Sequence, residues 1–164
     1  MSFRSGIPYT PAVNIRTPGY LFAATRPNLV PGRSNNPTEG VSAGCPGIPA
    51  GRKLQAPDLY FDPCAFSPPP PGTLGNVGRN TIIAPNVFTM DLSLQREFVL
   101  DAKRRFQFRA EFFNLPNHTN FNRNVGTSTV IFSGASGSLS PAVARIGSTA
   151  STARQIQFAL RVSF

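Results

Sequence analysis

The residues whose chemistry could support catalysis or metal binding are few and widely spaced. The sequence has one histidine, His118 in the segment "NLPNHTNF", and two cysteines, Cys45 and Cys64. A structural zinc site needs about four ligands and an activated nucleophile needs a base beside it, and neither set can be assembled here. We therefore predict no catalytic residue, no metal site and no cofactor, and we predict that the chain is not an enzyme.

The two cysteines lie in a stretch rich in proline and glycine. In an oxidising compartment Cys45 and Cys64 could close this stretch as a disulfide. In a reducing compartment they would be free thiols. The sequence leaves both alternatives open.

Strict alternation of apolar and polar side chains is the strongest pattern in the second half of the chain. It is clearest in the closing "ARQIQFALRVSF" and recurs in "NVFTMDLSLQR" and "RFQFRAEFF". A period of two predicts strands with one apolar and one polar face. We predict antiparallel strands at about 87–97, 105–114 and 154–164, the first two forming a hairpin. A helix through the second segment is the alternative, but it accounts for fewer of the residues.

Chain-breaking residues divide the sequence into two parts. Gly 14 and Pro 17 make up about 19% of the 164 residues, against about 12% in an average protein, and they crowd the first half. We predict that residues 1–86 are an irregular loop region with a strand stub at 1–10, and that 87–164 hold the strands. A long loop, 115–153, separates the second strand from the last.

The apolar faces of these strands need an apolar medium. The sequence offers no helix and no second sheet to cover them, and no charge is expected to interrupt them. Alternating strands of about ten residues match the hydrocarbon thickness crossed by membrane β-barrels. The predicted fold is therefore all-β: antiparallel strands from the C-terminal end of a transmembrane β-barrel, with long irregular extracellular loops.

The polar face of the same strands would line the barrel lumen. An ion network that solvates the inner wall is a simpler interpretation of it than a substrate path. A hairpin centred near Asp101 would place Ser93 opposite Arg109 and Asp91 opposite Glu111. The residues predicted to face the lumen are Asp91, Ser93, Gln95, Gln107, Arg109, Glu111, Gln157 and Arg161.

Several ordered motifs carry a family resemblance. "YFDPCAF", "GTLGNVGRNTI", "MDLSLQREF", "RFQFRAEFFNLPNHTNF" and "STARQIQFALRVSF" resemble, in that order, the C-terminal end of TonB-dependent outer-membrane receptors. They are most similar to large Oar-like receptors of acidobacteria, whose N-terminal extension resembles a carboxypeptidase regulatory domain. The last strand resembles the signal that the barrel-assembly machinery reads in outer-membrane proteins. The residues of that signal would be Ile156, Phe158, Leu160, Val162 and Phe164.

The resemblance implies a bacterial outer-membrane location and a role in transport. Its implied partners are the remainder of the receptor barrel and plug, the barrel-assembly machinery and outer-membrane lipid. Because no plug and only three long strands are recognised, we expect the C-terminal piece of a receptor, not competent for transport alone.

The net charge of +9 supports an alternative. A small basic protein could bind nucleic acid or a protein partner, and a non-functional fragment is a further alternative. The positive charge is scattered, however, apart from the cluster at residues 103–105. Nucleic-acid sites usually gather their charge in a patch or stripe, so no nucleic acid is expected as a partner.

Overall fold

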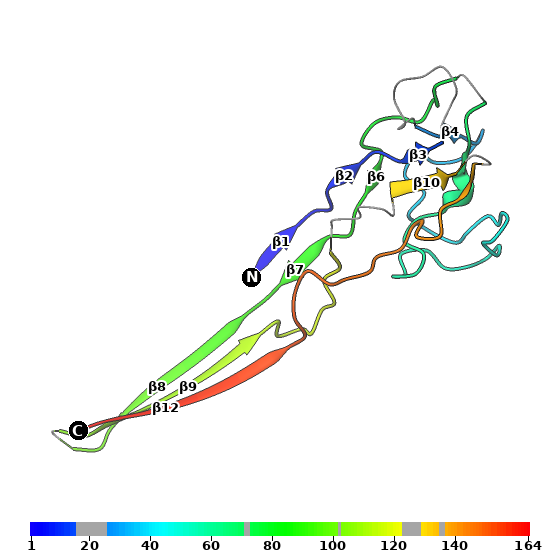
Figure 1. The fold of residues 1–164 in the computed structure, drawn as a ribbon. Coiled ribbons are helices and arrows are strands. Elements are labelled where there is room, and N and C mark those ends of the chain that lie inside the picture. The colour runs from blue at the N-terminus through cyan, green and yellow to red at the C-terminus, as the bar shows by residue number, and fades with distance from the viewer. Residues whose placement is uncertain (16–25, 71–72, 102, 123–128, 135–136) are drawn as a thin grey trace. The chain divides into compact units, whose positions relative to one another are not determined.

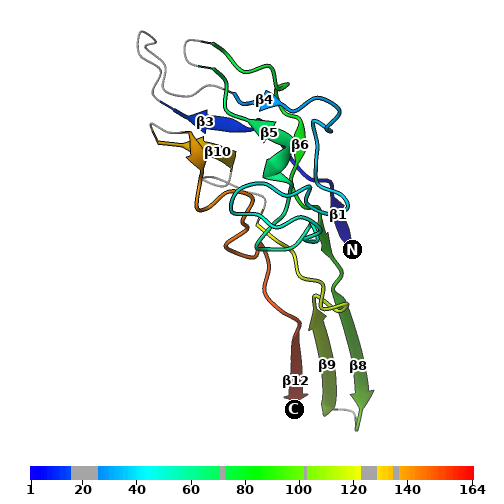
Figure 2. The same ribbon diagram turned by 90° about the vertical axis from the view of Figure 1, so that its right-hand side faces the viewer.

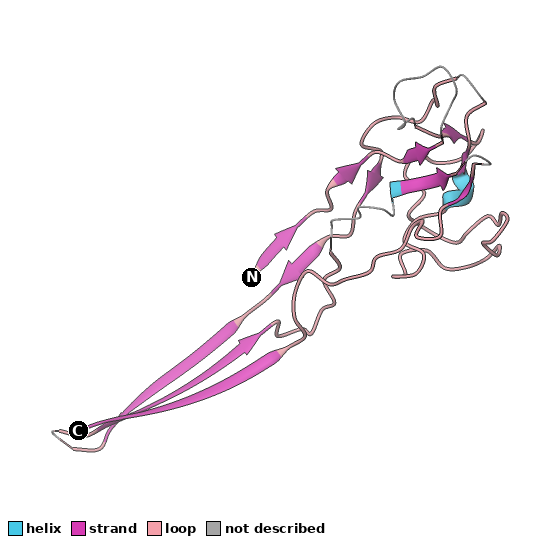
Figure 3. Cartoon of the chain, in the orientation of Figure 1, coloured by secondary structure: helices cyan, strands magenta, loops and turns pink. Residues whose placement is uncertain are grey.

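A computed structural model describes residues 1–15, 26–70, 73–101, 103–122, 129–134 and 137–164. Parts of the two predicted loop regions, residues 16–25, 71–72, 123–128 and 135–136, lie outside this description. The described residues form β-strands and short 3₁₀ segments (Figure 3). Among them no helix is long and apolar enough to cross a membrane.

The chain divides into two compact units. Unit 1 comprises residues 1–5, 86–121 and 149–164, and unit 2 comprises residues 6–85 and 122–148. This division differs from the predicted boundary after residue 86. Pairing between distant segments causes the difference, because the N-terminal strand joins unit 1 and part of the predicted loop 115–153 joins unit 2.

Three long strands form the main sheet of unit 1. They are β8 (Leu92–Val99), β9 (Arg105–Phe113) and β12 (Gln155–Ser163). The sheet is antiparallel with the order β12-β9-β8, so the central strand is β9 (Figures 1 and 2). The prediction of an all-β fold with antiparallel strands is confirmed. The chain breaks the first predicted strand at residues 90–91, leaving a short β7 (Val87–Thr89) before β8.

The predicted register of the hairpin is wrong by two residues. Ser93 lies opposite Glu111, and Gln95 lies opposite Arg109. The turn is centred one position later than expected because the Asp101 carboxylate accepts hydrogen bonds from the backbone N–H groups of residues 103 and 104, each 2.9 Å long. A shift of two residues keeps each side chain on its predicted face, since strand side chains repeat every second residue.

The predicted strand stub at 1–10 consists of two short strands, one in each unit. In unit 1, β1 (Ser2–Arg4) pairs antiparallel with β7, and Phe3 lies opposite Phe88. In unit 2, β2 (Pro8–Tyr9) pairs with β6 (Ile82–Ile83).

The other strands of unit 2 are equally short. β10 (Val130–Ser133) lies between a parallel neighbour, β3 (Ala12–Asn14), and an antiparallel one, β11 (Ser138–Leu139). β4 (Asn28–Leu29) pairs with β5 (Phe66–Ser67), which follows the 3₁₀ helix η1 (Pro63–Ala65). Proline and glycine between these pieces keep each of them short, because proline cannot donate a ladder hydrogen bond.

Unit 2 has a hydrophobic core, which the prediction of an irregular region did not include. Phe61 is fully buried, and its ring centroid lies 6.4 Å from that of Tyr9 and 6.3 Å from that of Phe66, edge-on in both cases. Leu59 and Ile131 beside it are at most 1% exposed. Segments that look irregular in sequence therefore fold around shared apolar side chains.

A disulfide and a buried carboxylate hold the loop that leads to η1. Cys45 and Cys64 are bonded in the structure, with a Cα–Cα distance of 5.5 Å. Asp62 is 3% exposed, and its carboxylate accepts hydrogen bonds from the Ser42 hydroxyl and from the N–H groups of Ala43 and Cys64. Closing a loop of this length stabilises a fold by about 3 kcal/mol in the chain-entropy account.

The motif "GNVGRN" makes a close backbone contact in unit 2. A Cβ at Gly75 would lie 1.9 Å from the carbonyl oxygen of Arg26, so a side chain has no room there. Beside it, Asn76 and Asn28 each accept a backbone N–H with their side-chain oxygen, from Leu29 and Asn76 respectively. The segment therefore requires glycine for packing.

Candidate functional site

The apolar face of the unit 1 sheet is exposed along the two outer strands, β8 and β12, whereas Ala110 on the central strand β9 is only 4% exposed. On β12, Phe158 and Leu160 are 68% and 66% exposed, and Leu94 on β8 is 54% exposed. The rings of Phe108 and Phe158 stack across β9 and β12 with centroids 6.1 Å apart. A strand of nine residues rises about 30 Å along its axis, or about 23 Å when tilted as in a barrel, which matches the apolar band of about 25 Å in such proteins.

This face consists of apolar side chains brought together by the register of the three strands. The predicted insertion-signal residues on β12 lie on it, apart from Phe164, which follows the strand and is 97% exposed. The other members follow from the strand pairing: Leu92, Leu94, Phe98, Phe106, Phe108, Ala110 and Phe112.

One charge interrupts the apolar face, contrary to the sequence analysis. Arg96 lies opposite Phe108, on the same face as Leu94 and Phe98. Its guanidinium carbon lies 5.2 Å from the centre of the Phe98 ring. A long arginine side chain can lay its stem along apolar surface and extend its head toward water, and here the head lies over Phe98, the next residue of this face toward the hairpin turn.

The opposite face is polar and carries ion pairs. Arg109 pairs with Glu111, and the Arg105 guanidinium lies 3.4 Å from the Glu97 carboxylate. With Gln107, Arg161 and Ser163, the second pair lines a shallow cavity of about 300 Å³. All these side chains are solvated, so such pairs contribute little to stability, about 0–1 kcal/mol each.

The structure groups most of the predicted lumen residues on this face. Rows across the strands place Ser93, Glu111 and Gln157 together, and then Gln95 beside Arg109. Gln107 and Arg161 form the next row with Glu97. Asp91 differs, because it precedes β8 and its carboxylate accepts a hydrogen bond of 2.9 Å from the backbone N–H of Asn114.

Asn114 connects the chain at the end of the sheet opposite the hairpin turn. It is 5% exposed and has a positive φ of 50°, which asparagine tolerates better than most residues. Its side-chain amide donates to the carbonyl oxygens of His118 and Thr152 and accepts from the His118 N–H. The segment before β12 is thereby fastened to the end of β9.

Asn120 makes a second connection of the same kind. It is fully buried, and its side chain exchanges two hydrogen bonds with the backbone of Phe88, of 2.7 and 2.8 Å. It also donates to the Ser151 hydroxyl. The Asn120 side chain thus makes the two backbone hydrogen bonds that a neighbouring strand would make with Phe88 of β7.

The remaining candidates lie in loops and turns and make local contacts. His118 packs its ring edge-on against Phe88, with centroids 6.1 Å apart, as a loop contact. Lys103 and Arg104 belong to the solvated turn built around Asp101. No group of three or more metal-binding side chains comes together among the described residues.

Sequence analysis missed three sets of residues. Glu97 and Arg105 continue the polar face, which a longer count of the alternation would have shown. The two asparagine connections give no local signal, because asparagine is ordinary in loops. A charged group in unit 2 around Arg52 was also missed.

An exposed, membrane-length sheet with one apolar and one polar face defines a class, the transmembrane β-barrel proteins. The sequence model of the family described as "outer membrane beta barrel domain" matches residues 1–157. The chain belongs to this family, and its location is the bacterial outer membrane. Neither the curated proteins nor the solved structures gave a match.

Proposed function

We propose that the chain forms the C-terminal barrel segment of a TonB-dependent outer-membrane receptor and takes part in transport only as part of that receptor. The carrying observation is the three-stranded sheet with a membrane-length apolar face. Within the described part of the chain, the outer edges of β8 and β12 have no partner strand. Hydrocarbon does not tolerate unpaired backbone groups, so further strands are needed on both sides.

The connections support the same proposal. Only residues 100–104 separate β8 from β9 in the sequence, whereas 114–154 separate β9 from β12. Outer-membrane barrels have short periplasmic turns and long extracellular loops. The disulfide of unit 2 lies in the long connection between β1 and β7. A disulfide suits an oxidising location outside the cytoplasm.

The register of β1 indicates where one missing strand would lie. Ser2 pairs with Thr89 and the two strands are antiparallel. A strand joined directly to the N-terminal end of β1 would therefore run along the free edge of β8. The proposed partners are the remaining barrel strands and a plug, with the barrel-assembly machinery reading the β12 residues, and we propose no catalysis.

The test is an immunoblot of outer-membrane fractions with an antibody against residues 114–122. The proposal expects a product several times larger than 17.6 kDa. Mass spectrometry of that product should find a plug domain and an N-terminal segment for energy coupling. A large barrel without a plug would contradict the TonB-dependent assignment alone, and a product of 17.6 kDa only would contradict the receptor segment altogether.

A further inference from the structure

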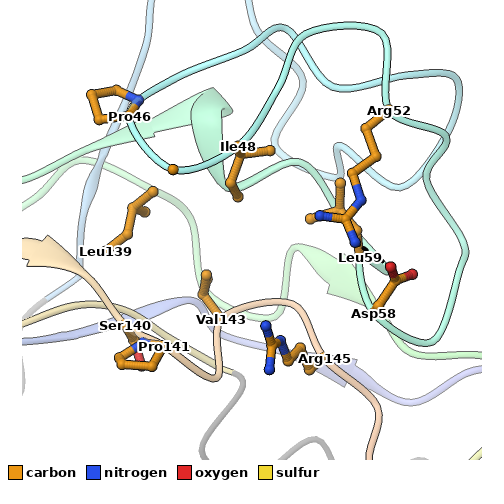
Figure 4. A pocket seen from close by; sticks show the side chains of 11 residues that line it. Pro46, Ile48, Arg52, Asp58, Leu59, Leu139, Ser140, Pro141, Val143 and Arg145 are labelled. Carbon is orange, nitrogen blue, oxygen red and sulfur yellow. Dashed lines mark hydrogen bonds and ion pairs between the residues drawn. The ribbon is translucent and has the colours of Figure 1, made fainter.

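A cavity in unit 2 combines an aliphatic wall with a charged end. It measures about 360 Å³ and lies between residues 46–59 and residues 139–145 (Figure 4). Ile48, Leu59 and Val143 form its apolar side and are at most 8% exposed. Arg52, Asp58 and Arg145 form its charged end, and these residues have no place in the proposed barrel function.

Backbone hydrogen bonds fix the two walls to each other. The Tyr60 N–H donates to the Ala144 carbonyl, and the Ile146 N–H donates to the Pro57 carbonyl, each over 2.7 Å. Ala144 is buried and has a φ of 59°, a conformation that residues with a Cβ rarely adopt. Unfavourable backbone conformations of this kind persist where surrounding contacts enforce them and are frequent at ligand sites. Arg145 is thereby held between two fixed residues.

The charges at this end do not balance. Arg52 forms an ion pair with Asp58, and none of the ion pairs among the described residues includes Arg145. The hydrogen bond from Arg52 and a backbone hydrogen bond hold the pKa of Asp58 below its ordinary value, and the charges of Arg52 and then Arg145 lower it to a smaller extent. Two guanidinium groups therefore act on one carboxylate, which leaves one positive charge in excess.

We propose that this cavity binds a small amphipathic monocarboxylate, whose carboxylate pairs with Arg145 and Arg52 while its apolar part lies against the aliphatic wall. Guanidinium groups match a carboxylate in shape and hydrogen-bond geometry. A single negative charge on the ligand neutralises the excess. A phosphate dianion beside Asp58 would reverse it, so the carboxylate is favoured.

The neighbouring cavity offers room for a larger apolar part. It measures about 600 Å³ and shares Pro46, Gly47 and Leu139 with the first cavity. The described residues that line it include Phe66 and Phe132 and no charged side chain. An acid with an aromatic end therefore suits the pair of cavities better than a short hydrophilic one.

The test is titration calorimetry on the full chain folded in detergent micelles, or on the longer product if cells make only that. The probe is 3-phenylpropanoate, and its uncharged counterpart 3-phenylpropanamide is the control ligand. We expect saturable binding of the acid and at least about tenfold weaker binding of the amide, because a charge-assisted pair is lost. No saturable binding of the acid by the folded chain, or equal binding of acid and amide, would overturn the proposal.

Three variants separate the site from general attraction to a basic protein. Arg145→Gln should weaken binding of the acid by about tenfold, whereas Arg33→Gln, an exposed residue of unit 2 outside the cavity, should not. Asp58→Asn should tighten binding, because Arg52 is released from its internal partner. Equal weakening by both arginine variants, or weaker binding by Asp58→Asn, would contradict the proposal. The inference does not depend on transport, so binding can be found or excluded whatever the size of the cellular product.

Discussion

Unit 1 and unit 2 use apolar side chains in opposite ways. On β12 of unit 1, Phe158 and Leu160 are more than half exposed, in a strict alternation with polar residues. In unit 2, Phe61 and Leu59 are at most 1% exposed and follow no such period. The sheet of unit 1 leaves apolar side chains exposed on its outer strands, whereas unit 2 buries its apolar side chains in its own core. One chain therefore contains both an exposed apolar face and a buried apolar core.

The two units also differ in what holds them together. Unit 1 depends on continuous strand ladders and on two asparagine side chains: Asn120 bonds the backbone of β7, and Asn114 fastens the segment before β12 to the end of β9. Unit 2 depends on a disulfide, a buried carboxylate and an aromatic core, because its strands are too short to support one another. Substitutions should therefore affect each unit through different physical terms, and four predictions use this difference.

The largest effect is expected in the core of unit 2. Phe61→Ala should lower the free energy of unfolding of unit 2 by about 3–5 kcal/mol, because it leaves a cavity where a buried ring was. Chemical denaturation in detergent measures this loss, with the susceptibility of unit 2 to proteolysis as the readout of unfolding. Insertion of the β8–β9–β12 sheet should persist, and loss of membrane insertion in this variant would show that the two units are not separable.

The next effect concerns the apolar face of unit 1, the face that the proposal assigns to lipid. Phe158→Arg should cost about 2–4 kcal/mol, because it places a charge near the middle of the apolar band. Gln157→Arg, one residue away on the polar face, is the matched control and should be mild. Folding titrations in lipid vesicles measure both. Equal costs for the two variants would contradict the assignment of the faces.

A smaller effect is expected at Asn120. Asn120→Ala should destabilise unit 1 by about 1–3 kcal/mol, since it leaves partly buried backbone groups of Phe88 without these partners. Asn122→Ala is the control, because the Asn122 side-chain amide donates to the exposed Ser148 hydroxyl, whereas the two side-chain hydrogen bonds to the backbone of Phe88 are made by Asn120. Hydrogen exchange at residues 87–89 should accelerate in the first variant alone. Unchanged exchange there would mean that the asparagine connection is not needed.

The smallest effect is a dependence of unit 2 on alkaline pH. Burial raises the pKa of Tyr60 from 10.0 to about 12, and its hydroxyl donates to the Ile83 carbonyl. Because the folded pKa is raised, the stabilisation is complete below pH 10.0 and is lost as the pH rises through about 12. Absorbance titration of the wild type and Tyr60→Phe measures the phenol, and a Tyr60 pKa near 10.0 would contradict its burial.

Strand positions in unit 1 were predictable because their cause is local. Alternation along β12 determines both the position of the strand and its two faces. Predicting the register between β8 and β9 required only the position of the turn. That position was misjudged because the turn is made by the Asp101 side chain, whose hydrogen bonds depend on conformation. Arg96 was overlooked because the polar residue before it, Gln95, obscured which face of the strand Arg96 takes.

Unit 2 was not predictable in the same way. Its core contains both Phe61 and Ile131, which lie far apart in the sequence, and no period in either segment indicates that they share one core. The pairing of β3 with β10 is equally distant. Arg52 and Arg145 are likewise brought to one cavity only by the backbone bonds between residues 57–60 and 144–146.

The sequence by itself determined the all-β class, the three long strands and their two faces, because a period of two is a local property of the chain. The tertiary structure alone decided the core of unit 2, the asparagine connections and the charged cavity. Each of these depends on contacts between residues far apart in the chain. Such contacts are selected by shape and hydrogen bonding in the folded state, which leave no periodic trace in the sequence.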